Sequence, residues 1–455
     1  MEDYDVIYIG SGNAAWQGAR FLSDAGMKIL IVEKGLYGGA CANYGCNSKI
    51  ALDAPYELSA AIKRFEGIGK VGDFSVDWPS LMKYKEEKIS AMPVFLDNKF
   101  KEYNLDVANG KGVLLDNHTV QVGDDIYHAD KIVISTGLDP IIPDIPGKEF
   151  LNTSDEFLEI KELPEKTIII GAGFVSIEFA SILAEAGLDV EVIVHSDTVL
   201  RNFYQPYVKK VVDILENQGV KFHYNEDVIE VTKENETLTV KTSSGLSVSG
   251  DYVISAIGRK ANVEGIGLEK VGVEFSDKGI PVNGFLQSNI PNIYATGDVA
   301  DTSAPKLVTV AIHQSKYLAK YLLGQTDEEI SYPVIPAVVF TLPRIATVGV
   351  RASDAENSDE YEVYKIPYGK SYSVVLKNET TAEATVVTDK QQNIVGAEIY
   401  SSEAENAANL FAFIINNKIT LEQLDEMIYA FPSSSSVLLY KLHNIHYKIG
   451  YRKDN

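Results

Sequence analysis

Short runs of hydrophobic residues alternate along this chain with longer stretches in which apolar positions recur at helical spacing. The runs at 5–9 and 29–32 are typical of buried strands, and the stretch between them is typical of a helix that stops at Gly26. A second copy of this pattern runs from 167 to 194, displaced by one constant offset. Repeated strand–helix–strand units predict an α/β protein with two Rossmann-like domains.

The pattern changes from about Pro333 onward. There, apolar and polar residues alternate in strand-length segments, and two helical stretches follow. This indicates a separate α+β domain, a type that often forms an association surface. The expected strands are 361–366, 381–388 and 394–400, and the expected helices are 403–416 and 421–428.

The turn after the first strand reads G-S-G-N-A-A and is typical of dinucleotide binding. Gly10 makes the tight turn, Gly12 lets a pyrophosphate approach, and the helix that follows points its N-terminus at the phosphate charge. Ala15 replaces the usual third glycine and still permits close packing. Glu33 ends the second strand, where a carboxylate binds a ribose hydroxyl.

The second copy has G-A-G-F-V-S at 171–176 and differs at the ribose position. Val194 is at the place equivalent to the first unit's carboxylate, and His195, Ser196 and Arg201 follow it. Neutral and basic residues there favour a 2′-phosphate, and therefore NADPH over NADH, unless Arg201 simply points to solvent. Two such units predict two cofactors, most simply a flavin and a nicotinamide.

Three further segments read as apolar strands that end in small residues and glycine. They lie at 132–137, 253–259 and 293–298, and each is suited to backbone that passes close to a cofactor. At the end of the third segment, Asp298 either accepts hydrogen bonds from a ligand hydroxyl or caps the next helix.

The only two cysteines, Cys41 and Cys46, lie close together among glycines. The alternatives are two inert buried thiols, a zinc site or a structural disulfide, but further zinc ligands are missing nearby and an export signal is not apparent. We therefore expect a redox-active dithiol and no metal. If Cys46 opens a helix, the helix N-terminus stabilises its thiolate, and a glycine-rich loop brings Cys41 back to it.

Composition narrows the class of partner. The chain has 455 residues and a formal net charge of −23, which argues against nucleic acid and anionic membranes because their phosphates would be repelled. Apolar runs of membrane-spanning length are absent from the sequence. We expect a cytoplasmic protein that acts on a small molecule.

Three motifs together resemble the class I pyridine nucleotide–disulfide oxidoreductases, the family of glutathione reductase, lipoamide dehydrogenase and mercuric reductase. G-G-x-C-x-N-x-G-C is present at 38–46, the flavin motif A-T-G-D at 295–298, and the interface motif V-V-F-T-x-P at 338–343. The resemblance covers essentially the whole chain.

This resemblance implies four parts and a homodimer. An FAD-binding domain would span 1–150, an NAD(P)H-binding domain 151–265, a central domain completing the FAD site 266–330, and a dimerisation domain 331–455. Electrons would pass from the nicotinamide through FAD to the Cys41–Cys46 disulfide.

The resemblance also implies roles for individual residues. Cys46 would be the thiolate against the flavin, Cys41 would attack the substrate, and Lys49 with Glu178 would form an ion pair near the flavin. The family usually has a proline before this lysine, whereas here the run is N-S-K. The residues expected to contact the cofactors are Gly10, Gly12, Ala15, Glu33, Lys34, Gly39, Ala40, Thr136, Gly137, Gly171, Gly173, Phe174, Val175, Glu178, His195, Ser196, Arg201, Gly258, Gly297 and Asp298.

The chain departs from the family near its C-terminus. Family members carry H-P-T-x-x-E, in which a histidine from the partner subunit shuttles protons, but here Phe431 and Ser436 hold the places of the histidine and glutamate. Phenylalanine cannot transfer a proton. 2-Oxopropyl-CoA oxidoreductase/carboxylase also has phenylalanine there. His443 and His446 are either substitutes or ordinary helix residues.

These observations favour an NADPH-dependent, FAD-containing reductase of a small disulfide. Because of Phe431, the alternative keeps the electron path but has another acceptor, such as a metal ion, a quinone or oxygen, or cleaves a thioether. A third hypothesis is a flavoprotein that senses redox state without catalysis.

Overall fold

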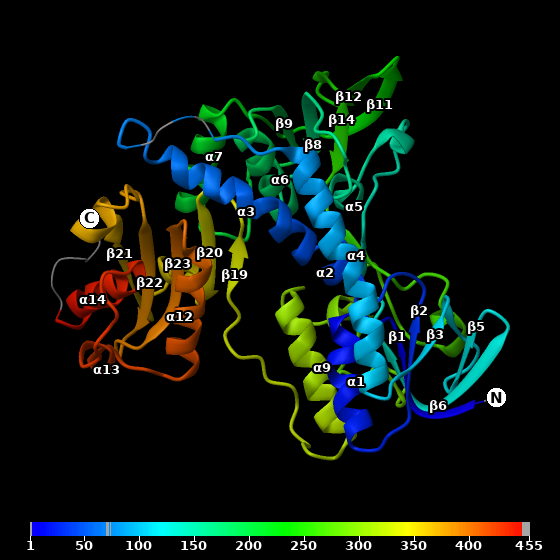
Figure 1. Ribbon diagram of the computed structural model, residues 1–455. Helices are drawn as coiled ribbons and strands as arrows, with labels where there is room; N and C mark the ends of the chain where they lie inside the picture. The colour runs from blue at the N-terminus through cyan, green and yellow to red at the C-terminus, as the bar shows by residue number, and fades with distance from the viewer. Residues whose placement is uncertain (1, 70–71, 73, 448–455) are drawn as a thin grey trace.

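A computed structural model describes residues 2–69, 72 and 74–447. Figure 1 shows a sheet near the N-terminus, a second sheet beside it and a third near the C-terminus, with the long helices α3 and α4 running between them. These two helices span Cys46–Lys63 and Trp78–Glu102. None of the described helices is long and apolar enough to cross a membrane.

The first sheet has the strand order β3-β2-β1-β6, and β17 adds to β6. These five strands are parallel. β2, β17 and the last residues of β1 and β6 are buried, which explains why those stretches read as continuous apolar runs. β4 and β5 extend the edge in antiparallel pairing. The strands are β1 (Glu2–Ile9), β2 (Ile29–Glu33), β3 (Asp106–Asn109), β4 (Gly112–Leu114), β5 (Thr119–Val122), β6 (Asp125–Ile134) and β17 (Ile293–Ala295).

Two helices pack together on the first sheet. α1 (Asn13–Asp24) and α9 (Val308–Leu322) lie side by side in Figure 1, and they touch most closely at Gly18, where an added Cβ would lie 2.2 Å from the backbone oxygen of Ser315. Ala15 is fully buried against the sheet. The close packing expected around Ala15 is therefore present, and Gly18 contributes the tightest helix–helix approach.

The second sheet repeats the architecture of the first. Its order is β10-β9-β8-β14, all parallel, and α6 and α7 accompany it. A separate antiparallel sheet, β11-β12-β13, projects from its edge. The elements are β8 (Lys166–Ile170), α6 (Phe174–Glu185), β9 (Asp189–Val194), α7 (Gln205–Asn217), β10 (Lys221–Tyr224), β11 (Val228–Glu234), β12 (Thr237–Thr242), β13 (Ser247–Gly250) and β14 (Tyr252–Ser255).

The C-terminal sheet is antiparallel, in the order β19-β20-β23-β22-β21. Phe411 of α12 and Leu438 of α14 are buried in its core. The alternation in the sequence therefore predicted this domain correctly. The elements are β19 (Ala337–Val339), β20 (Arg344–Gly349), β21 (Tyr361–Ile366), β22 (Glu383–Asp389), β23 (Ile394–Ser401), α12 (Ala404–Asn416), α13 (Leu421–Asp425) and α14 (Ser434–His446).

One predicted helix is shorter than expected. The stretch 421–428 forms a helix only over Leu421–Asp425. Thr420 starts it with a capping box, and Leu421 and Leu424 bury its inner face. Ile428 is 97% exposed, so the last turn has little burial to stabilise it.

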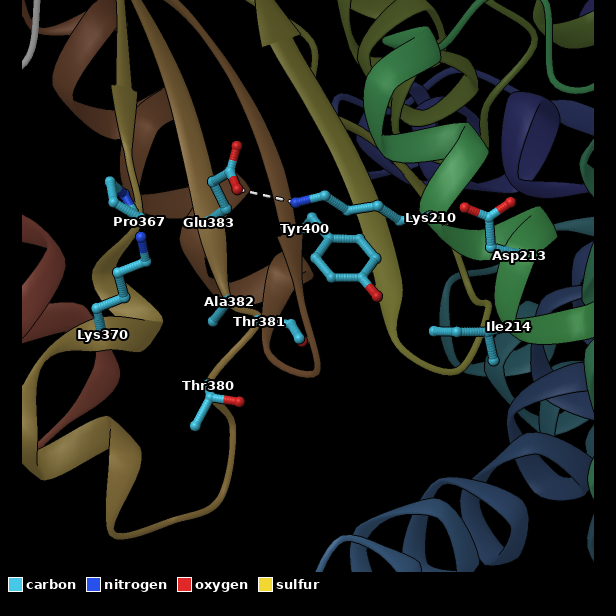
Figure 2. Close-up of a pocket in the computed structure, with 10 residues that line it drawn as sticks. All are labelled: Lys210, Asp213, Ile214, Pro367, Lys370, Thr380, Thr381, Ala382, Glu383 and Tyr400. Carbon is cyan, nitrogen blue, oxygen red and sulfur yellow. Dashed lines mark hydrogen bonds and ion pairs between the residues drawn. The ribbon is translucent and has the colours of Figure 1, made fainter. Parts of the chain in front are cut away.

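Short elements connect these bodies. β7 pairs with β15 and links the first unit to the second. Lys210 of α7 forms an ion pair of 2.8 Å with Glu383 of β22, and Figure 2 shows it reaching across from the second unit to the C-terminal sheet beside Tyr400. The remaining elements are α5 (Ser154–Phe157), α8 (Leu268–Val271), α10 (Ala352–Ala355), α11 (Tyr372–Val375), β7 (Leu138–Pro140), β15 (Arg259–Ala261), β16 (Ile280–Pro281), β18 (Ala300–Asp301), and the 3-10 turns Lys148–Phe150, Gly297–Val299 and Tyr368–Lys370.

Candidate active site

The two cysteines lie on adjacent helical segments. Cys46 is the first residue of α3, as the sequence predicts. Cys41 lies in a short helix, α2 (Gly39–Asn43), and not in the expected loop. The helical backbone is interrupted between them, and at Gly45 the chain turns so tightly that an added Cβ would lie only 3.1 Å from the backbone oxygen of Ala40. This tight reversal brings the two sulfur atoms together.

The two thiols are both partly buried, and each is the main influence on the pKa of the other. Both cysteines are free, and their side chains are hydrogen-bonded to each other. That hydrogen bond lowers the pKa of Cys46 to about 6, with help from the Lys49 charge, although burial and Glu178 oppose it. The same hydrogen bond and burial raise the pKa of Cys41, and the nearby Asp298 charge adds to this. The pair therefore favours a single thiolate, and the Lys49 charge favours its location on Cys46.

Lys49 and Glu178 form an ion pair next to the dithiol. The Lys49 ammonium lies 3.1 and 3.0 Å from the two carboxylate oxygens of Glu178, which is 3% exposed. Lys49 is on the first turn of α3, and Glu178 is on α6 of the second unit. The run N-S-K keeps this placement without the family's proline, because buried Ser48 donates to the backbone oxygen of Asn43 at 2.7 Å.

A segment of the C-terminal sheet also reaches this pair, which sequence reasoning did not predict. The backbone N–H of Phe340 donates to Glu178 at 2.9 Å, and the Lys49 ammonium lies 4.0 Å from the centre of the Phe340 ring. Behind it, the buried Arg344 contacts Asp53 on α3. The motif V-V-F-T-x-P marked this segment, but only as an interface motif.

The turn after β1 is built to receive a dinucleotide. Gly10 has φ +111°, and a side chain there would meet the backbone oxygen of Ser135 at 2.4 Å. Gly12 precedes α1, whose N-terminus is open to a phosphate. The carboxylate of Glu33 accepts from the backbone N–H groups of Ser11 at 3.0 Å and Gly35 at 2.7 Å, which holds it at the end of β2. The residues present fit a bound dinucleotide.

The motif A-T-G-D packs against this turn. β17 pairs with β6, and the Thr296 hydroxyl donates to the backbone oxygen of Ala14 at 3.0 Å. Gly297 passes so close to α1 that an added Cβ would lie 2.5 Å from Ala14. Burial raises the pKa of Asp298, partly offset by the charges of Lys306 and Arg259. Asp298 lies within a 3-10 turn, and among the described residues it caps no helix.

Thr136 and Gly137 follow β6 on the same side of the sheet. Both residues are held by the backbone of Asn262. The Thr136 hydroxyl donates to the backbone oxygen of Asn262 at 2.7 Å, and the backbone N–H of Asn262 donates to the backbone oxygen of Gly137 at 3.0 Å. Gly39 lies directly beside Gly12, where an added Cβ would be 3.2 Å from the Gly12 Cα. Lys34 and Ala40 are exposed at the rim. The structure therefore brings the predicted residues of the first unit together.

The second unit has the same turn with a more open surface. Gly171 has φ +114°, and a side chain there would meet the backbone oxygen of Ala256 at 2.4 Å. Among the described residues, nothing lies within 4 Å of a Cβ placed on Gly173. Phe174 opens α6 and is 52% exposed, Val175 follows it, and Gly258 lies exposed beyond β14. This arrangement also fits a dinucleotide.

The ribose position of the second unit contains a residue that sequence reasoning missed. His195 pairs through Nδ1 with the carboxylate of Asp227, which lies just before β11. Backbone hydrogen bonds at 3.1 and 3.0 Å, from residues 225 and 226 to Ser196 and Val194, hold Asp227 there. Arg201, which follows these residues in the sequence, is exposed to solvent. A carboxylate therefore accompanies the basic residues at this position.

Phe431 and Ser436, which replace the family's histidine and glutamate, lie in different surroundings. Phe431 is 66% exposed at the surface. Ser436 is buried and completes the capping box that starts α14, in which Ser433 accepts from its backbone N–H at 3.1 Å. His443 and His446 lie on α14, and His443 pairs with Asp425. Ser433 is thus the N-cap of α14, and Ser436 is the N3 member of its capping box.

Two dinucleotide turns, a polarised dithiol and an antiparallel C-terminal sheet define a flavin- and nicotinamide-dependent disulfide oxidoreductase. Family comparison agrees: residues 4–315 match the pyridine nucleotide-disulphide oxidoreductase model, and 335–440 match the dimerisation domain of the same family. The chain belongs to the class I pyridine nucleotide–disulfide oxidoreductases.

Individual relatives carry different names. A dihydrolipoyl dehydrogenase of Chlamydia muridarum is 30% identical, covering 96% of this chain and 95% of the relative. A glutathione reductase of Nostoc is 29% identical, covering 95% and 98%. A mercuric reductase of Staphylococcus aureus is 30% identical, covering 93% and 79%. Similar identity to three differently named enzymes shows the family but not the substrate.

Proposed function

We propose that this protein is an NADPH-dependent reductase of a small disulfide, with Cys41 and Cys46 as its redox pair. The observation that carries the proposal is the placement of the two cysteines on either side of the reversal at Gly45, with Cys46 at the N-terminus of α3 and the Lys49–Glu178 ion pair beside it. A pair of this kind reduces an external disulfide by thiol–disulfide exchange.

FAD in the first unit would supply two-electron transfer between the nicotinamide and the dithiol. Gly10, Gly12 and the N-terminus of α1 would hold its pyrophosphate, Glu33 a ribose, and Asp298 a hydroxyl of its chain. Lys49 and Glu178 would fix the charge beside the flavin ring. Gly171, Gly173 and α6 would hold the nicotinamide dinucleotide, with Phe174 over its entrance.

The exchange step balances without a histidine. The reduced pair carries one proton and one negative charge. The Cys41 proton moves to the Cys46 thiolate, and the Cys41 thiolate formed in this way attacks one sulfur of the substrate. The first half of the substrate leaves as a thiolate and takes that proton from Cys46, which restores the Cys46 thiolate. The Cys46 thiolate then attacks the Cys41 sulfur, so the intramolecular disulfide forms and the second half of the substrate leaves as a thiolate, which water protonates. The substrate gains two electrons and the pair loses two.

Steady-state assays with NADPH and a panel of low-molecular-weight disulfides test this proposal. One of them should be turned over, and Cys41→Ser should lower that turnover by roughly 10³-fold or more because it removes the attacking sulfur. Flavin reduction by NADPH in the variant is the control, since it does not need Cys41. Turnover that survives Cys41→Ser, or a panel without any substrate, would contradict the proposal.

Phe431 favours a second candidate, an acceptor other than a disulfide, such as a metal ion, a quinone or oxygen, or a thioether that is cleaved. In the family a histidine at this place moves protons, and phenylalanine does not. Phe431→His distinguishes the candidates. If disulfide reduction rises toward a family-like rate, the disulfide is the substrate; if it stays flat while another acceptor is still reduced, the second candidate holds.

The preference for NADPH is part of the proposal. Two residues support it. Because Val194 is apolar, β9 does not end in a carboxylate that would repel a 2′-phosphate, and the exposed Arg201 could supply a cation for that phosphate. Asp227 weakens the contribution of His195, because its carboxylate already pairs with that ring. We therefore expect a moderate preference that rests mainly on Arg201.

We also propose a homodimer and the four segments 1–150, 151–265, 266–330 and 331–455 as its FAD, NAD(P)H, central and dimerisation domains. The match to a dimerisation domain supports this, as do exposed apolar side chains on the C-terminal part, namely Phe413, Met427, Ile428, Phe431 and Tyr440. Sedimentation analysis of the full chain tests the dimer. A cytoplasmic setting is proposed because the dithiol must remain reducible.

A further inference from the structure

Five residues of the C-terminal domain, 340–344, dock on the helix that carries the thiolate. The Phe340 ring contacts the Lys49 ammonium, 4.0 Å from the ring centre, and the Phe340 backbone N–H donates to Glu178 at 2.9 Å. Phe340 thus touches both members of the ion pair. A cation held against an aromatic face in a partly desolvated place is stabilised there.

Arg344 anchors this segment from behind. Its guanidinium carbon lies 4.9 Å from the centre of the Phe340 ring. Its nitrogen atoms contact Asp53 at 3.0 Å, Glu57 at 2.7 Å and Glu405 at 2.9 Å. The Arg344 side chain is only 8% exposed, so these contacts are little screened by water.

The contacts on α3 share one face. Lys49, Asp53 and Glu57 are spaced four residues apart, which places them in one row along the first three turns after Cys46. Phe340 meets the first member of this row, and Arg344 meets the other two. The segment therefore fixes the active-site helix relative to the C-terminal sheet.

We infer that Phe340 and Arg344 are positioning residues, which hold the Lys49 ammonium between Glu178 and the N-terminal turn of α3 so that its charge acts on Cys46. This inference rests on the proposed redox role of Cys46. Neither residue touches the reacting sulfur atoms. Phe340 acts on Lys49 directly, and Arg344 acts through Phe340 and the acidic row of α3.

The charge balance at Cys46 explains why this position matters. The groups that act on its thiol are Cys41 on α2, Lys49 on α3 and Glu178 on α6. Cys41 has the largest effect; beyond it, Lys49 favours the thiolate and Glu178 opposes it, so this part of the charge balance depends on where the ammonium lies between them. Without the ring, water enters and Glu178 alone holds the ammonium, so we expect its effect on Cys46 to fall.

Alkylation of Cys46 tests the inference in the full-length, FAD-loaded protein. Cys41→Ser leaves Cys46 as the only cysteine, and its rate of reaction with iodoacetamide is measured across pH 5–9. Adding Phe340→Leu, which keeps the backbone N–H but loses the ring, should slow alkylation at pH 6.5 by about threefold to tenfold and move the midpoint upward. Phe340→Tyr keeps a ring and should restore the parent profile.

Arg344→Lys keeps the charge but loses the planar fork, and should give a smaller shift in the same direction. Lys210→Met is the matched control, because Lys210 also forms an ion pair between domains and lies over Tyr400 at 5.0 Å from the ring centre, away from the dithiol. It should leave the profile unchanged. Thermal unfolding of each variant checks that it is folded.

Equal midpoints for Phe340→Leu, Phe340→Tyr and Lys210→Met would overturn the inference. The proposed function fails differently: reduction of the wild-type protein with NADPH would then give no long-wavelength thiolate–flavin band and no disulfide turnover. Because alkylation needs neither electron transfer nor substrate, each idea can fail without the other.

Discussion

The two dinucleotide units have nearly the same backbone at their first glycine but different surroundings one turn later. Gly10 and Gly171 have φ +111° and +114°. A Cβ added to Gly10 would lie 2.4 Å from the backbone oxygen of Ser135, and one added to Gly171 would lie 2.4 Å from that of Ala256. The second glycines differ. Gly12 lies beside Gly39, the first residue of α2, whereas Gly173 is uncovered among the described residues.

This difference suits two kinds of binding. The first turn is covered by the segment that carries the cysteines, as a cofactor that stays in place requires. The second is open and bordered by the exposed Phe174, as a nucleotide that enters and leaves at every turnover requires. Under the proposed function, the shared turn would bind phosphate in both units, and the neighbouring segments would set how long each ligand stays.

The largest effect should come from alanine at the two equivalent glycines. Gly10→Ala places a Cβ against the Ser135 oxygen and should abolish FAD retention, seen as loss of the flavin absorbance of the purified protein. Gly171→Ala should retain FAD but lose reduction by nicotinamide. If Gly171→Ala lost FAD instead, the assignment of cofactors to units would be wrong.

A smaller effect is expected from Glu33→Gln. The change removes a charged acceptor for a ribose hydroxyl and should weaken FAD binding by about tenfold to a hundredfold, as expected for one hydrogen bond to a charged group. Titration of the apoprotein with FAD, followed by flavin fluorescence, measures this. Lys34→Met, on the exposed neighbouring residue, is the control and should bind FAD normally.

Making the second unit resemble the first is the third change. The Val194 side chain is only 1% exposed, so the exposed residue that follows it is the one to change. His195→Glu puts a carboxylate directly after β9, and should shift the ratio of NADPH to NADH efficiency by roughly tenfold toward NADH, because the carboxylate repels a 2′-phosphate. Rates of flavin reduction with each nucleotide give the ratio. An unchanged ratio would mean that the ribose lies elsewhere.

The smallest effect is expected from Asp227→Asn. It frees His195 and removes a negative charge, and should strengthen binding of 2′,5′-ADP by about twofold to fivefold, the size expected for an exposed ion pair. Isothermal titration calorimetry measures the affinity. Binding of 5′-AMP, which has no 2′-phosphate, should not change. Weaker binding of 2′,5′-ADP would show that Asp227 orients His195 for the phosphate.

Much of the fold could be predicted because its signals are local. Strand and helix boundaries in both units lie within a few residues of the expected ones, since continuous apolar runs and stopping glycines act over short distances. The strand 29–32 and the helix that begins at Cys46 are examples. The helix expected over 421–428 failed because its last turn has no neighbour to bury it.

The sequence by itself determined the two nucleotide turns, the dithiol at a helix start and the antiparallel C-terminal sheet, because each depends on residues close together in the chain. Only the tertiary structure decided which distant groups act on them. Asp227 comes to His195 from a distant part of the same unit. Phe340 comes to Lys49, and Arg344 to Asp53, through contacts between separate domains. Such contacts leave no periodic pattern in the chain, and therefore local spacing could not predict them.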